Sequence, residues 1–195
     1  MNELINLDPT FTESAFKTQI DNMFVMLHMS YMTSNLKRVA HFISKDVYEE
    51  YEKKLEELNS KNLRQMYDEL NVKSTDIVDI KISEEKFIIK VKLISRYMDY
   101  IVDKTTNKLV SGNNKSRVEK TNFLTLEKIR NFKIASIIKK CPNCGASISV
   151  NTSGVCPFCR NIYNQSDYSW ILTHIETIDS VSYTHLRAHE TDQYL

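Results

Sequence analysis

The hydrophobic pattern changes its period near Asn71, and this change limits the fold more than any other feature of the chain. Before Asn71, apolar residues recur at the spacing of amphipathic helices. After it, apolar and charged residues alternate, as in residues 78–82, which read Val-Asp-Ile-Lys-Ile. Alternation with period two is typical of strands that bury one face. Helices followed by antiparallel strands predict an α+β domain in which the helices pack on one face of a curved sheet.

A long amphipathic helix is expected to begin near residue 11, where Thr10 and Glu13 form a capping-box pattern. Six apolar residues then fall within one arc of about 100°, and they are Phe16, Ile20, Met23, Phe24, Leu27 and Tyr31. The second half of this helix is apolar nearly all round, because further apolar residues lie off that arc, namely Val25, Met26, Met29 and Met32. Something therefore covers more than one side of the helix.

Two shorter helices and a set of strands complete the expected domain. Ser34 and Ser44 are placed to cap the two helices. Acid-before-base pairs support the second of them, and they are Glu49 with Lys53 and Glu50 with Lys54. Strands are expected over residues 78–82, 87–93, 97–102 and 118–129, with a turn at 104–107 that leads into 108–110.

The composition supports one main domain with a small appendage. The chain has 195 residues, 42% of them hydrophobic, which is enough for one good core but not for two full domains. Its 26 basic and 25 acidic residues create no overall field that would draw it to nucleic acid or an anionic membrane. The start lacks a signal-peptide pattern, and no segment approaches the ~20 apolar residues of a transmembrane helix. We therefore expect a cytoplasmic chain that reaches a membrane only peripherally.

The last fifteen residues, 181–195, do not look like part of the fold. The run VSYTHLRAHET resembles the translated end of a common sequencing adapter. We treat this segment as an artefact and exclude it from the fold, as one excludes a fusion scar. His185 and His189 are excluded with it, although their spacing of four could suggest a metal pair on a helix.

All four cysteines lie in one stretch, CPNCGASISVNTSGVCPFC, as two Cys-x-x-Cys pairs with eleven residues between the pairs. Each pair can deliver two thiolates to one tetrahedral metal ion, and the four ligands would be Cys141, Cys144, Cys156 and Cys159. Redox or iron–sulfur chemistry and disulfides are the alternatives. A reducing compartment weighs against disulfides, and a thioredoxin-like centre would need one pair beside a βαβ pattern. The stretch therefore favours a structural zinc site.

Four thiolates would close the coordination shell, so we expect the zinc to stabilise a small ribbon rather than to catalyse a reaction. The ribbon could instead present a binding surface. A small basic and aromatic patch suited to nucleic acid would comprise Lys133, Lys139, Lys140, Phe158 and Arg160. Four charges give only a weak, salt-sensitive footprint, and a solvated linker explains the lysines equally well.

The sequence contains no visible catalytic machinery. Asp99 and Asp103 are the only tempting carboxylate pair, but four residues along a strand separate their backbones by about 13 Å, too far for a shared proton. His28, His41 and His174 are isolated from one another. No nucleophile elbow, phosphate-binding glycine loop or His-Glu-x-x-His motif is present. We expect a non-enzymatic protein without catalytic residues.

Several of these segments together resemble a known family. The segments are residues 99–103 (Asp-Tyr-Ile-Val-Asp), residues 110–112 (Val-Ser-Gly), the cysteine stretch, and residues 168–172 (Tyr-Ser-Trp-Ile-Leu). They resemble bacterial proteins in which a Tim44-like domain precedes a zinc ribbon. The resemblance covers most of residues 10–178 and is most specific in the cysteine stretch and in residues 99–103.

The resemblance implies a fold and a division of the chain. The namesake domain is the membrane-docking part of the mitochondrial import-motor anchor, an α+β cone similar to the nuclear-transport-factor-two and cystatin-like group. The division implied here is a Tim44-like domain over residues 10–130, a linker over 131–140, a zinc ribbon with a C-terminal segment over 141–178, and the excluded segment over 181–195.

The resemblance also implies a deep apolar pocket inside the cone. The pocket residues expected on the first long helix are Phe16, Ile20, Met23, Phe24, Met26, Leu27 and Tyr31. Methionines adapt to varied apolar shapes, which suits a binding groove, although the same residues also serve as ordinary core filler. The expected function is a binding module for a lipid tail, an apolar peptide, or a membrane or membrane protein, related to protein transport.

Overall fold

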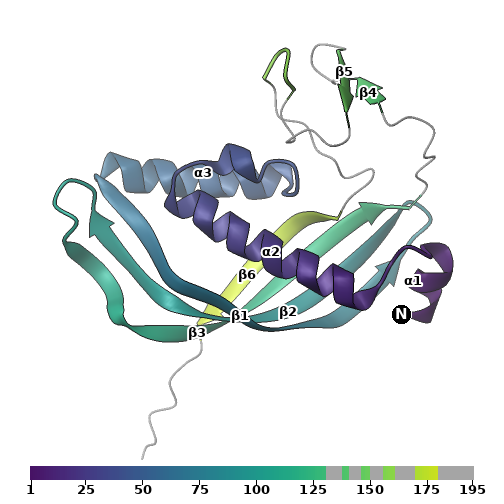
Figure 1. Cartoon of the computed structure of the whole chain (residues 1–195), viewed down its shortest axis with the longest axis horizontal. Coiled ribbons are helices and arrows are strands. Elements are labelled where there is room, and N and C mark those ends of the chain that lie inside the picture. The colour runs from purple at the N-terminus through teal and green to yellow at the C-terminus, as the bar shows by residue number, and fades with distance from the viewer. Residues whose placement is uncertain (131–137, 141–145, 150–155, 161–169, 180–195) are drawn as a thin grey trace, which may run out of the picture.

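The computed structural model describes residues 1–130, 138–140, 146–149, 156–160 and 170–179. Two helices lie across the concave face of a curved antiparallel sheet, and a short helix stands at one end of the sheet beside the N-terminus (Figure 1). This arrangement confirms the α+β class and the packing of helices on one face that the sequence pattern predicts.

The helices are α1 (Asn2–Leu7), α2 (Glu13–Met32), the 3-10 helix η1 (Leu36–Arg38) and α3 (Lys45–Ser60). The expected capping box at the start of α2 is wrong. The backbone and hydroxyl of Thr10 both bond to Asp8 Oδ1, so Thr10 belongs to the turn before the helix, and Thr12 is the N-cap residue. Because Thr10 is used in this turn, α2 begins at Glu13 instead of near residue 11.

Serine 44 caps α3 as the sequence predicts, since Ser44 Oγ accepts a hydrogen bond from Val47 N–H at 3.3 Å. Ser34 does not cap η1, because Asn35 is its N-cap residue and Ser34 takes a left-handed conformation with a φ of 53°. The expected second helix is the single turn of η1. Of the two expected ion pairs on α3, Lys54 bonds to Glu50 at 2.6 Å, whereas Glu49 pairs with Lys45 at 3.2 Å rather than with Lys53.

The main sheet has the strand order β1-β2-β3-β6, with every neighbouring pair antiparallel. Its strands are β1 (Leu63–Ile82), β2 (Lys86–Asp103), β3 (Leu109–Ile129) and β6 (Ile171–Asp179). A separate two-stranded sheet pairs β4 (Ile138–Lys140) with β5 (Ser147–Ser149).

The first three strands are longer than their sequence pattern indicates. β1 begins eight residues before Asn71, and β2 continues through residues 94–96, where the sequence pattern breaks because the polar Ser95 occupies a buried, inward-facing position. A bulge over residues 114–117 lies inside β3, which the sequence pattern also divides. A bulge shifts the alternation by a residue, so one strand looks like two. Gly112 has a φ of 83°, and an added Cβ would lie 2.3 Å from the Asp99 carbonyl oxygen, which explains why residues 99–103 and Gly112 occur together.

Strand β6 returns to the main sheet after the cysteine stretch. Ile171 lies opposite Glu127 of β3, and on its other side Leu172 forms a parallel bridge with Ile43, just before α3. The 41 residues from 130 to 170 therefore connect two neighbouring strands of one sheet. The α+β domain includes residues 171–179, which the division by sequence places with the ribbon.

The core lies between the inner face of α2 and alternate residues of β2 and β3. His28 is buried within it, and His28 Nδ1–H donates to the Phe24 carbonyl at 2.9 Å while the imidazole packs on Phe24, Tyr67 and Tyr97. Burial lowers the pKa of His28 from 6.5 to about 4, against a smaller opposing effect of the bond to Phe24. His28 is a neutral core residue at physiological pH.

We predict a specific acid sensitivity from His28. Between pH 6.5 and 4 the unfolded chain binds a proton at this histidine while the folded chain does not, so the free energy of unfolding falls as the pH drops through this range. The part due to His28 amounts to about 3 kcal/mol. Urea unfolding at a series of pH values should show the full fall in the wild type and in His174→Gln, an exposed control. The fall should be smaller in His28→Gln, where only the burial-lowered pKa of His41 still contributes a histidine effect. An equal fall in all three proteins would contradict the prediction.

Candidate functional site

The structure places six of the seven expected pocket residues in the packed core. Phe16, Ile20, Met23, Phe24, Leu27 and Tyr31 are all at most 7% exposed. Met26 points outward and is 38% exposed. The two cavities described here lie elsewhere, and of the seven residues only Phe16 lines one of them.

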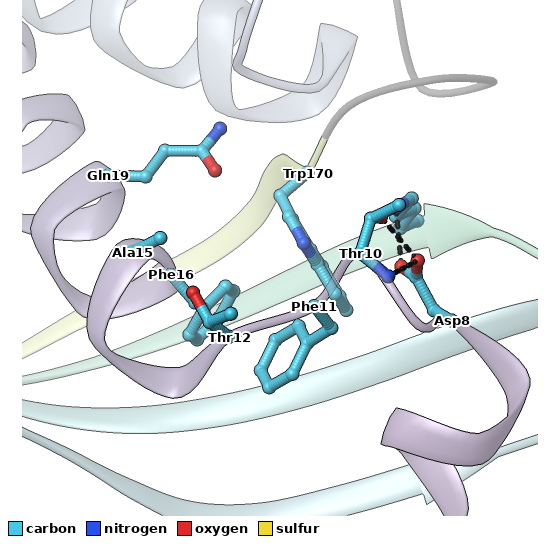
Figure 2. Close-up of a pocket in the computed structure, with 9 residues that line it drawn as sticks. Asp8, Thr10, Phe11, Thr12, Ala15, Phe16, Gln19 and Trp170 are labelled. Atoms are coloured by element: carbon cyan, nitrogen blue, oxygen red, sulfur yellow. Dashed lines mark hydrogen bonds and ion pairs between the residues drawn. The ribbon is translucent and has the colours of Figure 1, made fainter.

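The first cavity has a volume of about 190 Å³ and lies where the N-terminal segment crosses the ends of β3 and β6 (Figure 2). Its lining residues come from four segments of the chain and are Asp8, Thr10, Phe11, Thr12, Ala15, Phe16, Gln19, Lys128 and Trp170. In Figure 2, Trp170 stands between Asp8 and Thr10 on one side and Ala15 and Gln19 on the other. We call this cavity the Trp170 pocket.

Aromatic side chains form the apolar wall of the Trp170 pocket. The Trp170 ring lies 5.0 Å from the Phe16 ring and 6.2 Å from the Phe11 ring, both edge to face, and 6.5 Å from the Phe87 ring. Trp170 is only 5% exposed. Edge-to-face clusters of this kind add to the stability that burial alone provides.

A partly buried ion pair forms the polar side of the pocket. Lys128 Nζ lies 2.6 Å from Asp8 Oδ2 and 6.0 Å from the centre of the Trp170 ring. Burial opposes ionisation of Asp8, but the hydrogen bonds from Lys128 and Thr10 and the charge of Lys128 outweigh it and lower the pKa of Asp8. The pair therefore ties the segment before α2 to β3 in its ionised form.

The second cavity has a volume of about 400 Å³ and lies between η1 and α3. Polar groups dominate its lining, which comprises Ser34, Asn35, Leu36, Lys37, Tyr48, Glu52, Leu55, Glu56 and Asn59. Only Leu36 and Leu55 supply a buried aliphatic floor. Tyr48 is the one aromatic residue of this lining, against three in the lining of the Trp170 pocket, so the second cavity offers no aromatic cluster to an apolar side chain.

Of the four cysteines, Cys141 and Cys144 lie outside the described residues. Cys156 is buried and Cys159 half-buried, at the two ends of one turn that the Arg160 N–H closes by donating to the Cys156 carbonyl at 2.8 Å. Arg160 has a φ of 60°, the left-handed conformation that Gly145 can take after the first pair. A turn with two thiols fits half of a tetrahedral zinc site. The described part of the chain alone contains no group of three or more metal-binding side chains.

Both carboxylates of the pair considered in the sequence, Asp99 and Asp103, have structural partners. Asp103 accepts hydrogen bonds from the backbone of Thr105 and Thr106 in the turn after β2, while Asp99 Oδ2 pairs with Lys120 at 2.5 Å. Phe158 is 70% exposed and Arg160 is exposed, but the side chains of the lysines of the proposed basic patch lie outside the described residues.

Comparison with known proteins identifies the family. A family model for the Tim44-like domain matches residues 1–136. The chain belongs to the Tim44-like domain family. Tim44-like domains are generally non-enzymatic scaffolds related to protein transport, and they associate peripherally with membranes. No helix in the described residues of this Tim44-like chain is long and apolar enough to span a bilayer.

Two further comparisons add little to the family assignment. No protein of curated function matches the chain. A solved structure that resembles it is the crystal structure of the intermembrane space region of the chloroplast protein ARC6, at 7% sequence identity and a TM-score of 0.42. That match covers 84% of this chain and 97% of the other.

Sequence patterns missed most of the Trp170 pocket. The periodicity of α2 finds residues that face the sheet, whereas the pocket collects side chains from segments as far apart as Asp8 and Trp170. One local signal was present, because a single tryptophan directly precedes an apolar strand. Its contact with Phe11 and Phe16 depends on β6 pairing with β3, which periodicity does not specify.

We predict that Asp8→Asn lowers the free energy of unfolding by about 1 to 2 kcal/mol at pH 7, because Lys128 then remains partly buried without a carboxylate. The loss should shrink as the pH falls below about 4, because the unfolded chain then binds a proton at Asp8, and it should disappear once the pH passes below the lowered pKa of Asp8 in the folded chain. Glu13→Gln is the matched control, since the exposed Glu13 side chain pairs with the half-buried Lys17 on the same helix and its loss should change stability by less than about 0.5 kcal/mol. Equal losses in the two variants would refute the role given to Asp8.

Proposed function

We propose that this Tim44-like chain is a docking module that holds an apolar side chain of a protein partner in the Trp170 pocket. The observation that carries the proposal is the pocket itself, with three aromatic rings on one wall and a fixed ion pair on the other. Apolar walls with a few placed polar groups are typical of specific binding sites. Membership of a family of scaffold domains supports a protein partner.

The size of the pocket favours a side chain over a lipid tail. Small-molecule sites usually measure about 300 to 1,000 Å³, and the Trp170 pocket measures about 190 Å³. A single leucine or phenylalanine side chain is a better match to this volume than an acyl chain is. Trp170 and its aromatic neighbours supply the kind of buried anchor point on which protein interfaces depend.

The proposal includes a structural zinc ribbon, as in bacterial proteins of similar arrangement. Cys156 and Cys159 on their turn would supply two thiolates, and Cys141 and Cys144 the other two. Zinc supplies folding energy to a module too small to have a core of its own. Because residues 130–170 join β3 to β6, the ribbon would project beside the Trp170 pocket, where it could contact the same partner.

A fluorescence titration tests the pocket, because Trp170 is the single tryptophan of the chain. N-acetyl-leucinamide serves as the probe for an apolar side chain, and vesicles of phosphatidylcholine with phosphatidylglycerol serve as the lipid arm. We expect N-acetyl-leucinamide to shift the Trp170 emission saturably, in the millimolar range normal for a fragment of this size. Vesicles should not produce the same saturable shift.

Thr12→Phe should abolish the response to N-acetyl-leucinamide by filling the pocket. Thr12 lines the pocket, is exposed, and makes no side-chain capping hydrogen bond, so the change removes no cap. Ser14→Phe is the control, as an exposed position two residues further along that does not line the pocket. Retention of the response in Thr12→Phe, or no saturable response in the wild type, would refute the proposal.

Cys144→Ser should release zinc while leaving the α+β domain folded. The zinc links shorten the connection between β3 and β6 to about half its length, and halving a loop is worth only about 0.6 kcal/mol. We therefore expect about one zinc per chain by metal analysis of the wild type and loss of that zinc in Cys144→Ser. Urea unfolding followed by Trp170 fluorescence should change by less than about 1 kcal/mol. Collapse of the whole domain would contradict the two-module arrangement.

A further inference from the structure

The outward face of α2 carries no charge after its first residue. α2 has seven exposed residues, and among them only Glu13 is charged. α3 lies on the same face of the sheet and has eleven exposed residues, nine of them charged. A charged outer face is normal for a helix in contact with water, so α3 follows the rule and α2 departs from it.

The two half-buried charged residues of α2 point toward β1 rather than outward. Lys17 Nζ lies 2.8 Å from Glu13 and 3.9 Å from Asp76 of β1. Asp21 Oδ1 accepts a hydrogen bond of 2.5 Å from Thr75 Oγ1 of β1. Both charges are therefore engaged at one flank of the helix, which leaves the outward face neutral.

The neutral face forms one continuous stripe opposite the core. At 100° per residue, six residues fall within an arc of about 100°, and they are Ala15, Thr18, Asn22, Val25, Met26 and Met29. The stripe runs for about 21 Å along the helix. Met26 is 38% and Met29 is 48% exposed. Exposed methionines adapt to the shape of a packing partner, so the stripe is suited to contact with another helix.

The stripe is complementary to itself when it is reversed. Asn22 stands at its midpoint, with the small residues Ala15 and Thr18 before it and the large residues Met26 and Met29 after it. In an antiparallel pair centred on Asn22, Ala15 faces Met29 of the partner subunit and Thr18 faces Met26 of the partner subunit. Small side chains then meet large ones on both sides of Asn22, as close packing requires.

We propose that α2 packs antiparallel against α2 of a second copy of this chain, with Asn22 on the two-fold axis. A two-fold interface brings the same patch of both copies together, and a patch without charge meets no like charge there. The Asn22 carboxamide has both donors and an acceptor, so two facing copies can exchange hydrogen bonds. Antiparallel helices also oppose their dipoles favourably.

The dimer would complete the Trp170 pocket. Ala15 belongs both to the stripe and to the lining of the pocket, so Met29 of the partner subunit would lie at the rim of the pocket. This contact adds an apolar side chain to the open side of the site. The dimer itself rests on the stripe alone, so it can be tested whether or not the Trp170 pocket binds a side chain.

Sedimentation equilibrium of the full, zinc-loaded chain over a range of concentrations tests the dimer. We expect the wild type to dimerise and Met29→Glu to raise the dissociation constant at least about tenfold, because it buries an unpaired charge. Val78→Glu is the matched control, since Val78 is 49% exposed on β1, and it should change the constant by less than about twofold. A wild type that remains monomeric, or equal effects of the two variants, would overturn the proposal.

Disulfide trapping tests the antiparallel register. Asn22→Cys should form a linked dimer under mild oxidation, since residue 22 faces its own copy within the reach of a disulfide. Thr18→Cys should not, because its copy lies about 12 Å away along the axis in this register. Both variants keep the four native cysteines, so these contribute equally to the background. Linking through Thr18→Cys as readily as through Asn22→Cys would overturn the antiparallel arrangement.

Discussion

The antiparallel pairing of β6 with β3 holds together the end of the α+β domain that contains the Trp170 pocket. It brings Trp170, which follows the long connection, against Phe11 and Phe16 from the N-terminal segment. The bridge from Leu172 to Ile43 fixes the other edge of β6 beside the start of α3. Without this strand the helices would lose one wall of their core, and the Trp170 pocket would have no aromatic wall.

The connection between β3 and β6 gives the cysteine stretch its place in the molecule. The sheet itself fixes the two described ends of this connection, because β3 and β6 pair directly. Loop closure favours this arrangement, because lengthening a connection costs little once the strands pair. The cysteine stretch carries part of the sequence resemblance to the family. The residues on either side of it, Lys128 of β3 and Trp170 before β6, line the Trp170 pocket.

Local rules predicted the parts of the fold that depend on neighbouring residues. The cap at Ser44, the pair of Glu50 with Lys54 and the core face of α2 agree with the sequence pattern because each involves residues within a few positions. The failed capping box has a local cause too, since Asp8 competes for Thr10. A bulge divided β3 in the sequence analysis because it interrupts the alternation of side chains, and the buried polar Ser95 divided β2.

The site could not be predicted in the same way, because it depends on contacts between distant segments. The sequence pattern of α2 identifies residues that fill the core. The two described cavities lie away from that core face, one beside the start of α2 and the other between η1 and α3. The apolar character of the second half of α2 had two origins, one in the core and one on the outward stripe. Sequence periodicity detected the apolar residues of both the core face and the outward stripe. It could not show that the outward stripe is left exposed by the described part of the chain.

The account depends most on the claim that β6, and not the cysteine module, completes the α+β domain. The direct measurement compares the unfolding free energy and the near-ultraviolet circular dichroism of two altered chains. In one, a short Gly-Ser linker replaces residues 131–169; the other ends at Arg130. The account predicts that the linked chain unfolds cooperatively with the aromatic signal of Trp170 retained, and that the chain ending at Arg130 is not stably folded. A linked chain that fails to fold, or a stable chain without β6, would contradict it.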